Sequence, residues 1–132
     1  MGSVVLDASV IIAVFDPLDI HHLSALNAIQ RAHVDGHRFL VPASVLAEVL
    51  VGEARRNGGI VEHRTAAVNR LFGPCRVLDR EVAATAAQLR ARHRALRLPD
   101  ALVIATGIID EATSIVTADK RWAGIDPRIT VL

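Results

Sequence analysis

The sequence has few of the residues on which several common kinds of protein depend. It has one cysteine, Cys75, so no disulfide can form within the chain, which fits a reducing compartment. Aromatic residues make up only 3% of the chain, with no Tyr, three Phe and one Trp, so a platform of stacked aromatic rings for binding bases is not expected. No apolar run approaches the roughly 20 residues that span a bilayer, and Asp7 interrupts the first apolar run, unlike in a secretory signal. We therefore expect a cytoplasmic protein with no membrane segment.

The charge is nearly balanced, with 15 basic and 14 acidic residues and a formal net charge of +1. This excludes a basic surface over the whole protein, so any contact with nucleic acid has to be local. None of the six histidines has the spacing of a zinc ligand set, which argues against a histidine-bound transition metal. The 132 residues contain no linker, repeat or low-complexity tract, and we expect a single domain over residues 1–132.

Short β-branched runs alternate with longer stretches rich in Ala and Leu. Strands are predicted at residues 4–6, 39–41, 76–78, 114–117 and 129–131, and helices at residues 9–15, 19–34, 43–56, 61–71, 80–96 and 99–109. Asp19 and Asp79 are candidate helix caps, and Pro99 suits the first turn of a helix. Alternation with apolar strands predicts an α/β fold in which helices cover both faces of a mainly parallel sheet of about five strands.

Three acidic residues stand at or near the predicted strand ends. Asp7 directly follows the first strand, Asp119 follows the strand at 114–117 after one residue, and Asp100 opens a helix. In open α/β sheets, ligands bind beyond the carboxyl ends of the strands, which is where these carboxylates are expected. Each also has a simpler interpretation, because Asp7 and Asp119 are good helix caps and Asp100 complements a helix dipole.

Glu48 stands in a helical segment in which nearly every neighbour is apolar. A buried carboxylate without a partner is costly, so Glu48 requires a cation unless it lies on the exposed stripe of its helix. Four carboxylates brought together repel one another, and a hard divalent cation with oxygen ligands compensates for that repulsion. Mg²⁺ or Mn²⁺ suits carboxylates best, and metal ions held in this way serve phosphodiester chemistry.

Four segments that carry these acids resemble, in order, the motifs of the PIN domain family. They are VVLDAS (residues 4–9), SVLAE (44–48), LPDALVIA (98–105) and VTADKRW (116–122). The resemblance covers essentially the whole chain, and its size is most similar to that of VapC-type toxins of toxin–antitoxin pairs. Two departures are Trp122, where many relatives have Phe, and Gly107, where Ala is usual. Neither replaces an acid, so they leave the choice of substrate open.

The resemblance implies a three-layer α/β/α sandwich, Mg²⁺-dependent cleavage of RNA, a homodimer and inhibition by a cognate antitoxin. It implies catalytic and metal-binding roles for the four acids, Asp7, Glu48, Asp100 and Asp119, with Mn²⁺ as a substitute ion. It also implies support from the hydroxyl groups of Ser9 and Thr117.

Basic residues near the acids are candidates for contacts with the RNA backbone. Arg90, Arg94 and Arg97 recur at helical spacing before Asp100, and Lys120 and Arg121 adjoin Asp119. The alternative for the three arginines is a solvated helix face. An apolar stripe is simplest as core, but it could also form an antitoxin groove that leads to the acids; its members are Val10, Ile11, Val14, Phe15, Val45 and Val49.

Other classes of protein fit less well. A phosphorelay receiver domain needs adjacent acids after the first strand and a lysine after the last one, and a phosphatase of the haloacid dehalogenase type needs a second aspartate where Ser9 stands. A glycine-rich phosphate-binding loop is absent after residues 4–6. A catalytically silent PIN-like interaction module is the strongest alternative, although such a module is expected to have lost one of the acids.

Overall fold

A computed structural model describes residues 2–132 and contains a parallel sheet flanked by helices. Its four strands run in the order β2-β1-β3-β4, with β1 at Ser3–Leu6, β2 at Arg38–Leu40, β3 at Ser114–Thr117 and β4 at Ile129–Val131. Leu6 of β1 pairs with Val116 of β3, so these two central strands end side by side. The residues that follow them therefore emerge together at the carboxyl edge of the sheet.

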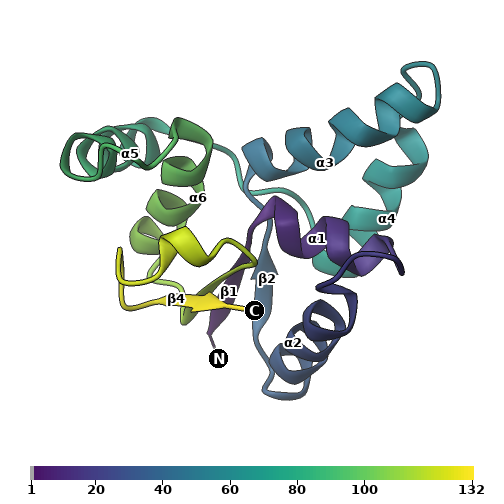
Figure 1. Ribbon diagram of the computed structural model, residues 1–132, viewed down its shortest axis with the longest axis horizontal. Helices are drawn as coiled ribbons and strands as arrows, with labels where there is room; N and C mark the ends of the chain where they lie inside the picture. Colours follow the sequence, from purple (N-terminus) through teal and green to yellow (C-terminus); the bar gives the residue numbers. More distant parts are fainter. Residues whose placement is uncertain (1) are drawn as a thin grey trace.

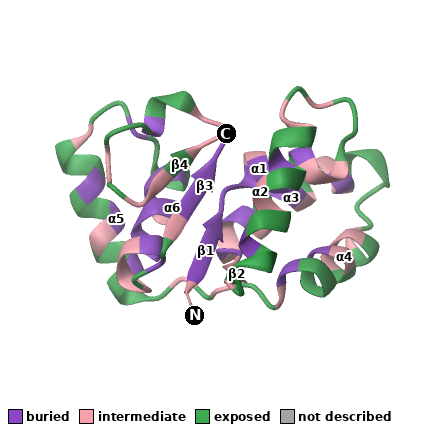
Figure 2. Ribbon diagram, turned by 90° about the horizontal axis from the view of Figure 1, so that it is seen from below, coloured by how far each residue is buried: buried purple, intermediate pink, exposed green. Residues whose placement is uncertain are grey.

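Helices cover both faces of the sheet, as the alternating sequence pattern predicts (Figures 1 and 2). On one side lie α1 (Ala8–Phe15), α2 (His22–Val34), α3 (Ala43–Arg56) and α4 (Glu62–Phe72). On the other lie α5 (Arg80–Arg92) and α6 (Leu98–Ile109), with the short 3₁₀ turn η1 (Lys120–Trp122) beside them. Within residues 2–132, no helix has both the length and the apolar character needed to cross a bilayer.

The predicted strand at residues 76–78 is wrong, and the sheet has four strands in the described part of the chain rather than about five. Only one bridge forms there, between Pro42 and Arg76. The Arg76 guanidinium binds both carboxylate oxygens of Asp110, at 2.8 and 2.7 Å, and also reaches Asp79 at 3.0 Å. Val77 is 69% exposed. The chain is thus held by a side chain at the sheet edge, and further strand pairing would bury little apolar surface.

Two helix boundaries also differ from the prediction. The helix predicted over residues 80–96 ends at Arg92, because Arg90 Nη1 donates a 2.6 Å hydrogen bond to the Leu96 carbonyl and holds residues 93–97 in a turn. Residues 19–21 form a turn before α2, in which the Asp19 carboxylate accepts from the His21 amide at 2.8 Å. Asp79 caps α5 and Pro99 lies in the first turn of α6, as predicted.

The core lies where α6 meets the two central strands. Val5, Leu6 and Ile115 are fully buried, and α6 contacts both of their strands. Gly107 of α6 lies against Ile115 and Val5. A Cβ at Gly107 would lie 2.5 Å from Ile115 Cγ1 and closer still to Cδ1, so an alanine here would force the Ile115 side chain or the helix to shift. This contact is a structural reason for glycine at a position where the resembling motif usually has alanine.

We predict that Gly107→Ala destabilises the protein by roughly 1–3 kcal/mol, the usual cost of overpacking a core, even though Ala favours helix over Gly by about 1 kcal/mol. The control is Gly52→Ala in α3, where the nearest atom to an added Cβ is Arg56 Nη1 at 3.5 Å. That substitution should stabilise the protein. Urea melts of both variants test the prediction, and a Gly107→Ala variant as stable as wild type would contradict it.

Candidate metal and active site

Asp7 lies where β1 passes into α1. Its amide donates to the Val116 carbonyl at 3.0 Å, which ties it to the end of β3. Its side chain is 6% exposed and caps α1 by accepting from the Ala8 amide at 2.8 Å. The capping interpretation of Asp7 is therefore correct, and it accounts for only one of the two carboxylate oxygens.

Two hydroxyl groups hold the other oxygen of Asp7. Ser9 Oγ and Thr117 Oγ1 each donate to Asp7 Oδ2 at 2.8 Å. Ser9 Oγ in turn accepts from the Ala118 amide, and Thr117 Oγ1 accepts from the Asp119 amide, both at 3.0 Å. The hydroxyls thus connect the loop after β1 to the loop after β3. They fix the Asp7 carboxylate relative to the backbone of Asp119.

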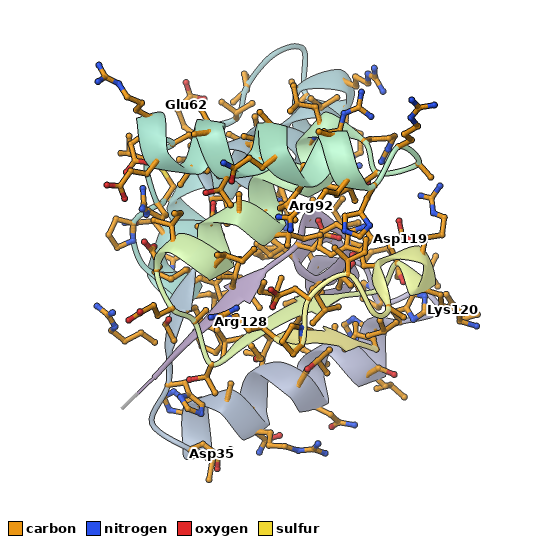
Figure 3. All side chains as sticks on the ribbon, turned by 90° about the vertical axis from the view of Figure 1, so that its left-hand side faces the viewer. Asp35, Glu62, Arg92, Asp119, Lys120 and Arg128 are labelled. Carbon is orange, nitrogen blue, oxygen red and sulfur yellow. The ribbon has the colours of Figure 1, made fainter. Side chains whose placement is uncertain are left out.

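All four predicted acids line one cavity of about 390 Å³ at the carboxyl edge of the sheet. Asp7 comes from the end of β1, Glu48 from α3, Asp100 from the first turn of α6, and Asp119 from the loop before η1. In Figure 3, the labelled Asp119 and Lys120 lie on the right-hand side of the molecule, whereas Glu62 lies at the upper left and Asp35 at the lower left. The remaining lining residues are Ala8, Ser9, Ile12, Val51 and Arg97.

Glu48 reaches this cavity from the exposed face of α3, not from a buried position. The sequence argument that burial forces Glu48 to have a cation therefore fails. Glu53, further along the same helix, is the buried acid that the sequence analysis missed. It is bound by Arg56 at 3.1 Å and Arg64 at 3.4 Å, so its charge is balanced within the protein and it needs no metal.

The cavity disfavours the charge of two of its acids. The pKa of Asp7 is raised chiefly by burial, against the lowering effect of the hydrogen bonds from Ser9, Thr117 and Ala8. The pKa of Glu48 is raised by partial burial and then by the negative charges of Asp7 and Asp100. Asp119 behaves in the opposite way, because its hydrogen bonds with Arg121 lower its pKa.

Two arginines contact the acids directly. Arg121 Nε and Nη2 grip both oxygens of Asp119 at 2.8–3.2 Å, and Arg97 Nε lies 3.4 Å from Asp100 Oδ2. Asp119 also caps η1 through the Arg121 amide, so its capping interpretation is also correct. Among residues 2–132, no three Asp, Glu, His or Cys side chains are close enough together to form a metal-binding group. Four carboxylates have the oxygen ligands that a hard divalent cation prefers, but they would have to move closer together and release these arginine contacts to bind one.

The other predicted basic residues are less closely grouped. Because α5 ends at Arg92, Arg90, Arg94 and Arg97 do not share one helix face. Arg90 holds the following turn through Leu96, while Arg94 is exposed within that turn. Lys120 is exposed on η1.

A groove lies beside the predicted stripe, but only Phe15 and Val49 of the stripe line it, and three of its six lining residues are charged. Val10, Ile11 and Val45 are fully buried in the core and cannot line a surface groove. A cavity of about 340 Å³ between α1, α3 and α4 is lined instead by Ile12, Phe15, Asp16, Val49, Arg56 and Arg64. The Arg64 guanidinium lies over the Phe15 ring, 4.1 Å from its centre. Ile12 lines both this groove and the acidic cavity, so the two are adjacent.

A parallel α/β sheet with four carboxylates around one cavity at its carboxyl edge defines a protein with a candidate metal-binding site. The chain belongs to the PIN domain family, whose pattern matches residues 4–126. The resemblance inferred from the four acidic motifs is thereby confirmed. No curated protein matches the chain significantly.

Several solved structures share this fold. A toxin–antitoxin complex from Klebsiella pneumoniae has a chain that is 21% identical, with a TM-score of 0.71 over 97% of this chain and 96% of that one. VapC20 of Mycobacterium tuberculosis, described as a sarcin–ricin loop cleaving toxin, is 21% identical with a TM-score of 0.66 over 92% and 95% of the two chains. VapBC2 of Rickettsia felis, solved with a promoter DNA fragment, contains a chain with 13% identity and a TM-score of 0.71 over 98% and 97%.

The raised pKa of Asp7 predicts how stability changes with pH in the absence of metal. A carboxyl group whose pKa is higher in the folded state adds most stability below its unfolded pKa, and that stability is lost as the pH rises through the folded pKa. The melting temperature of wild type minus that of Asp7→Asn should therefore fall as the pH rises from the ordinary pKa of an aspartate through the raised pKa of the folded state. Any hydrogen bonds lost in Asp7→Asn shift this difference but do not give it that slope.

Asp79 provides a control of opposite sign. Its pKa is lowered by the Val82 amide and by Arg76, so its contribution is lost as the pH falls. The difference between wild type and Asp79→Asn should not fall over the same range. Thermal melts with a chelator present give both differences, and parallel curves for the two variants would refute the assignment of Asp7.

Proposed function

We propose that this protein is a ribonuclease that depends on Mg²⁺ or Mn²⁺ and acts in the cytoplasm as the toxin of a type II toxin–antitoxin pair. The observation that supports it most is that Asp7, Glu48, Asp100 and Asp119, from four separate segments, line one cavity. Membership of the PIN domain family and the fold shared with toxins agree with this proposal.

In this proposal the four carboxylates are the metal ligands. A divalent ion at this place would supply a water of lowered pKa and would neutralise charge on the attacked phosphate. Ser9 and Thr117 keep Asp7 Oδ2 in a fixed direction, which preorganises the most buried ligand. Arg97 and Arg121, once released from Asp100 and Asp119, are placed to bind phosphate oxygens beside the site.

The lining of the cavity favours chemistry at a metal ion, because among the described residues it holds four acids and no cysteine, and Ser9 serves to orient Asp7. RNA is the proposed substrate because of a protein that shares the fold. Among the proteins that share the fold, VapC20 is described as cleaving the sarcin–ricin loop, which is RNA. The exposed cations Arg94 and Lys120 would add contacts with the RNA backbone.

A catalytically silent interaction module remains the second candidate. It is favoured by one observation. Arg121 donates hydrogen bonds to both carboxylate oxygens of Asp119, and these balance the charge of that acid without any metal. The two candidates differ in whether metal and substrate displace the arginine, and the nuclease assay below separates them.

The proposed partner is an antitoxin whose apolar segment lies in the groove between α1, α3 and α4. Ile12 connects that groove to the acidic cavity, so a basic side chain of the antitoxin could reach Asp7, Glu48 or Asp100 and take the place of the metal's charge. A homodimer is also part of the proposal, by analogy with the family.

We predict that the purified protein cleaves RNA with Mg²⁺ or Mn²⁺ and loses this activity in excess EDTA. Asp7→Asn, Glu48→Gln and Asp100→Asn should each lower kcat by about 100-fold or more, because a lost ligand disturbs the ion that carries the chemistry. The matched control is Asp35→Asn, an exposed acid after α2 and outside the cavity. Full activity in EDTA would contradict the nuclease, and absence of metal-dependent cleavage by wild type would favour the silent module.

We predict that Ile12→Arg weakens antitoxin binding by about 30-fold or more, because it replaces apolar contact surface with a charge where the groove meets the acidic cavity. Val77→Arg, an exposed apolar residue elsewhere, is the control and should bind normally. Asp7→Asn should also bind the antitoxin more weakly than wild type if a basic side chain reaches the acids. Calorimetry without divalent metal measures all three, and wild-type affinity of Ile12→Arg would place the antitoxin elsewhere.

A further inference from the structure

A second cavity, of about 330 Å³, lies directly beside the acidic one. Asp100 and Asp119 line both, so the two share a wall. The rest of the second cavity is formed by the turn after α5, with Arg94 and Leu96, and by the segment around η1, with Trp122 and Ile125. None of these four residues belongs to the acid set, and the ribonuclease proposal uses only Arg94 among them, as a contact with the RNA backbone.

Trp122, which lines this cavity, has an indole N–H group without a hydrogen-bond acceptor among the described residues. Its side chain is 1% exposed, and its indole Nε1 is buried with no hydrogen-bond partner among residues 2–132. A buried donor left without an acceptor costs roughly 1–3 kcal/mol, so buried indole N–H groups generally have a partner. Because Nε1 is itself buried, an acceptor brought by a ligand in this cavity would remove that cost only after the indole or the wall beside it moves.

The other walls suit a flat heterocycle with polar edges. Leu96 is buried and Ile125 half-buried, and these supply apolar surface. Arg94 is exposed and makes no hydrogen bond with another residue in the described part of the chain. The turn that carries both Arg94 and Leu96 is fixed by the bond from Arg90 to the Leu96 carbonyl, so the wall is preformed. The volume is within the range of about 300–1,000 Å³ typical of small-molecule sites.

We propose that this second cavity is a subsite for one nucleobase of the RNA substrate, adjacent to the phosphate held at the acids. This inference rests on the proposed ribonuclease function. Trp122 Nε1 and the Arg94 guanidinium are both hydrogen-bond donors, so the subsite selects a base with a carbonyl oxygen over adenine, which has none; guanine and uracil, which carry one without the amino donor of cytosine beside N3, suit it best. Because the Trp122 ring is buried, it reads the edge of the base and does not stack on its face.

The single tryptophan makes the test direct. With one Trp in the chain, the indole N–H gives one resonance in a ¹H–¹⁵N spectrum. Metal-free protein is titrated with guanosine, uridine and adenosine 5′-monophosphates and with ribose 5-phosphate. The indole resonance should move in a saturable way with the guanosine or uridine nucleotide, less with the adenosine nucleotide, and not with ribose 5-phosphate.

Two variants identify the donors. A neutral hydrogen bond is worth about two- to tenfold in affinity, so Trp122→Phe should weaken binding of guanosine or uridine 5′-monophosphate by that factor in calorimetry. Arg94→Ala, at an exposed position that leaves the core untouched, should weaken binding by a similar factor and keep the indole resonance for observation. Arg92→Ala, on the exposed end of α5 and outside the cavity, is the matched control.

Several results would overturn the subsite. These are an indole resonance that no nucleotide moves, an equal response to ribose 5-phosphate, which indicates a phosphate site only, and an indole shift produced by the antitoxin alone, which indicates a pocket for a partner side chain. The titration needs neither metal nor turnover. A negative titration beside metal-dependent RNA cleavage therefore rejects the subsite and leaves the nuclease intact, whereas failure of cleavage itself is read from the EDTA experiment.

Discussion

The fixed position of the Asp7 carboxylate is the constraint around which the site is organised. Parallel pairing of Leu6 with Val116 brings the ends of β1 and β3 together, and the hydroxyls of Ser9 and Thr117 then connect the two loops through one carboxylate oxygen. Without these two donors, burial would leave a charge with poor solvation. The same bonds that make Asp7 tolerable thus also determine where Asp119 lies, since Thr117 accepts from its amide.

Repulsion among the acids is relieved unevenly. Asp119 is neutralised by Arg121, Asp100 is contacted by Arg97, and Glu53 is neutralised away from the cavity by Arg56 and Arg64. Among the described residues, no arginine forms an ion pair with Asp7 or Glu48; burial raises the pKa of both, and the charge of Arg97 only partly opposes this at Glu48. The cavity therefore combines two acids without an ion pair and two acids with arginine contacts. A fold selected only for stability would have paired all four acids.

The sequence predicted what depends on local pattern and strand order. Apolar runs gave β1 and β3, and the rule that ligands bind at carboxyl ends placed Asp7 and Asp119 correctly at one edge. The predictions from the sequence failed where a single side-chain contact determines where a strand or helix ends. Arg76 binds Asp110 across the fold and ends the predicted strand at 76–78, and Arg90 caps a turn that divides the predicted helix at 80–96. Such contacts join residues that no periodicity relates, which is also why the ion pair between Glu53 and Arg64 of the next helix was missed.

The acidic cavity and the second cavity beside it differ in the contacts that hold their walls in place. This difference separates the residues proposed for chemistry from those proposed for recognition. Asp7 and Asp119 follow strands whose register is set by the buried core, including the close approach of Gly107 to Ile115, so their positions change only if the core changes. The walls opposite, residues 93–97 and 122–125, are turns whose shape depends on a few bonds such as that from Arg90 to Leu96. Substitutions in those turns can alter the shape and donors of the second cavity without moving the carboxylates. The acid geometry is thus tied to folding itself, whereas the adjoining pocket is free to vary with the ligand that it must fit.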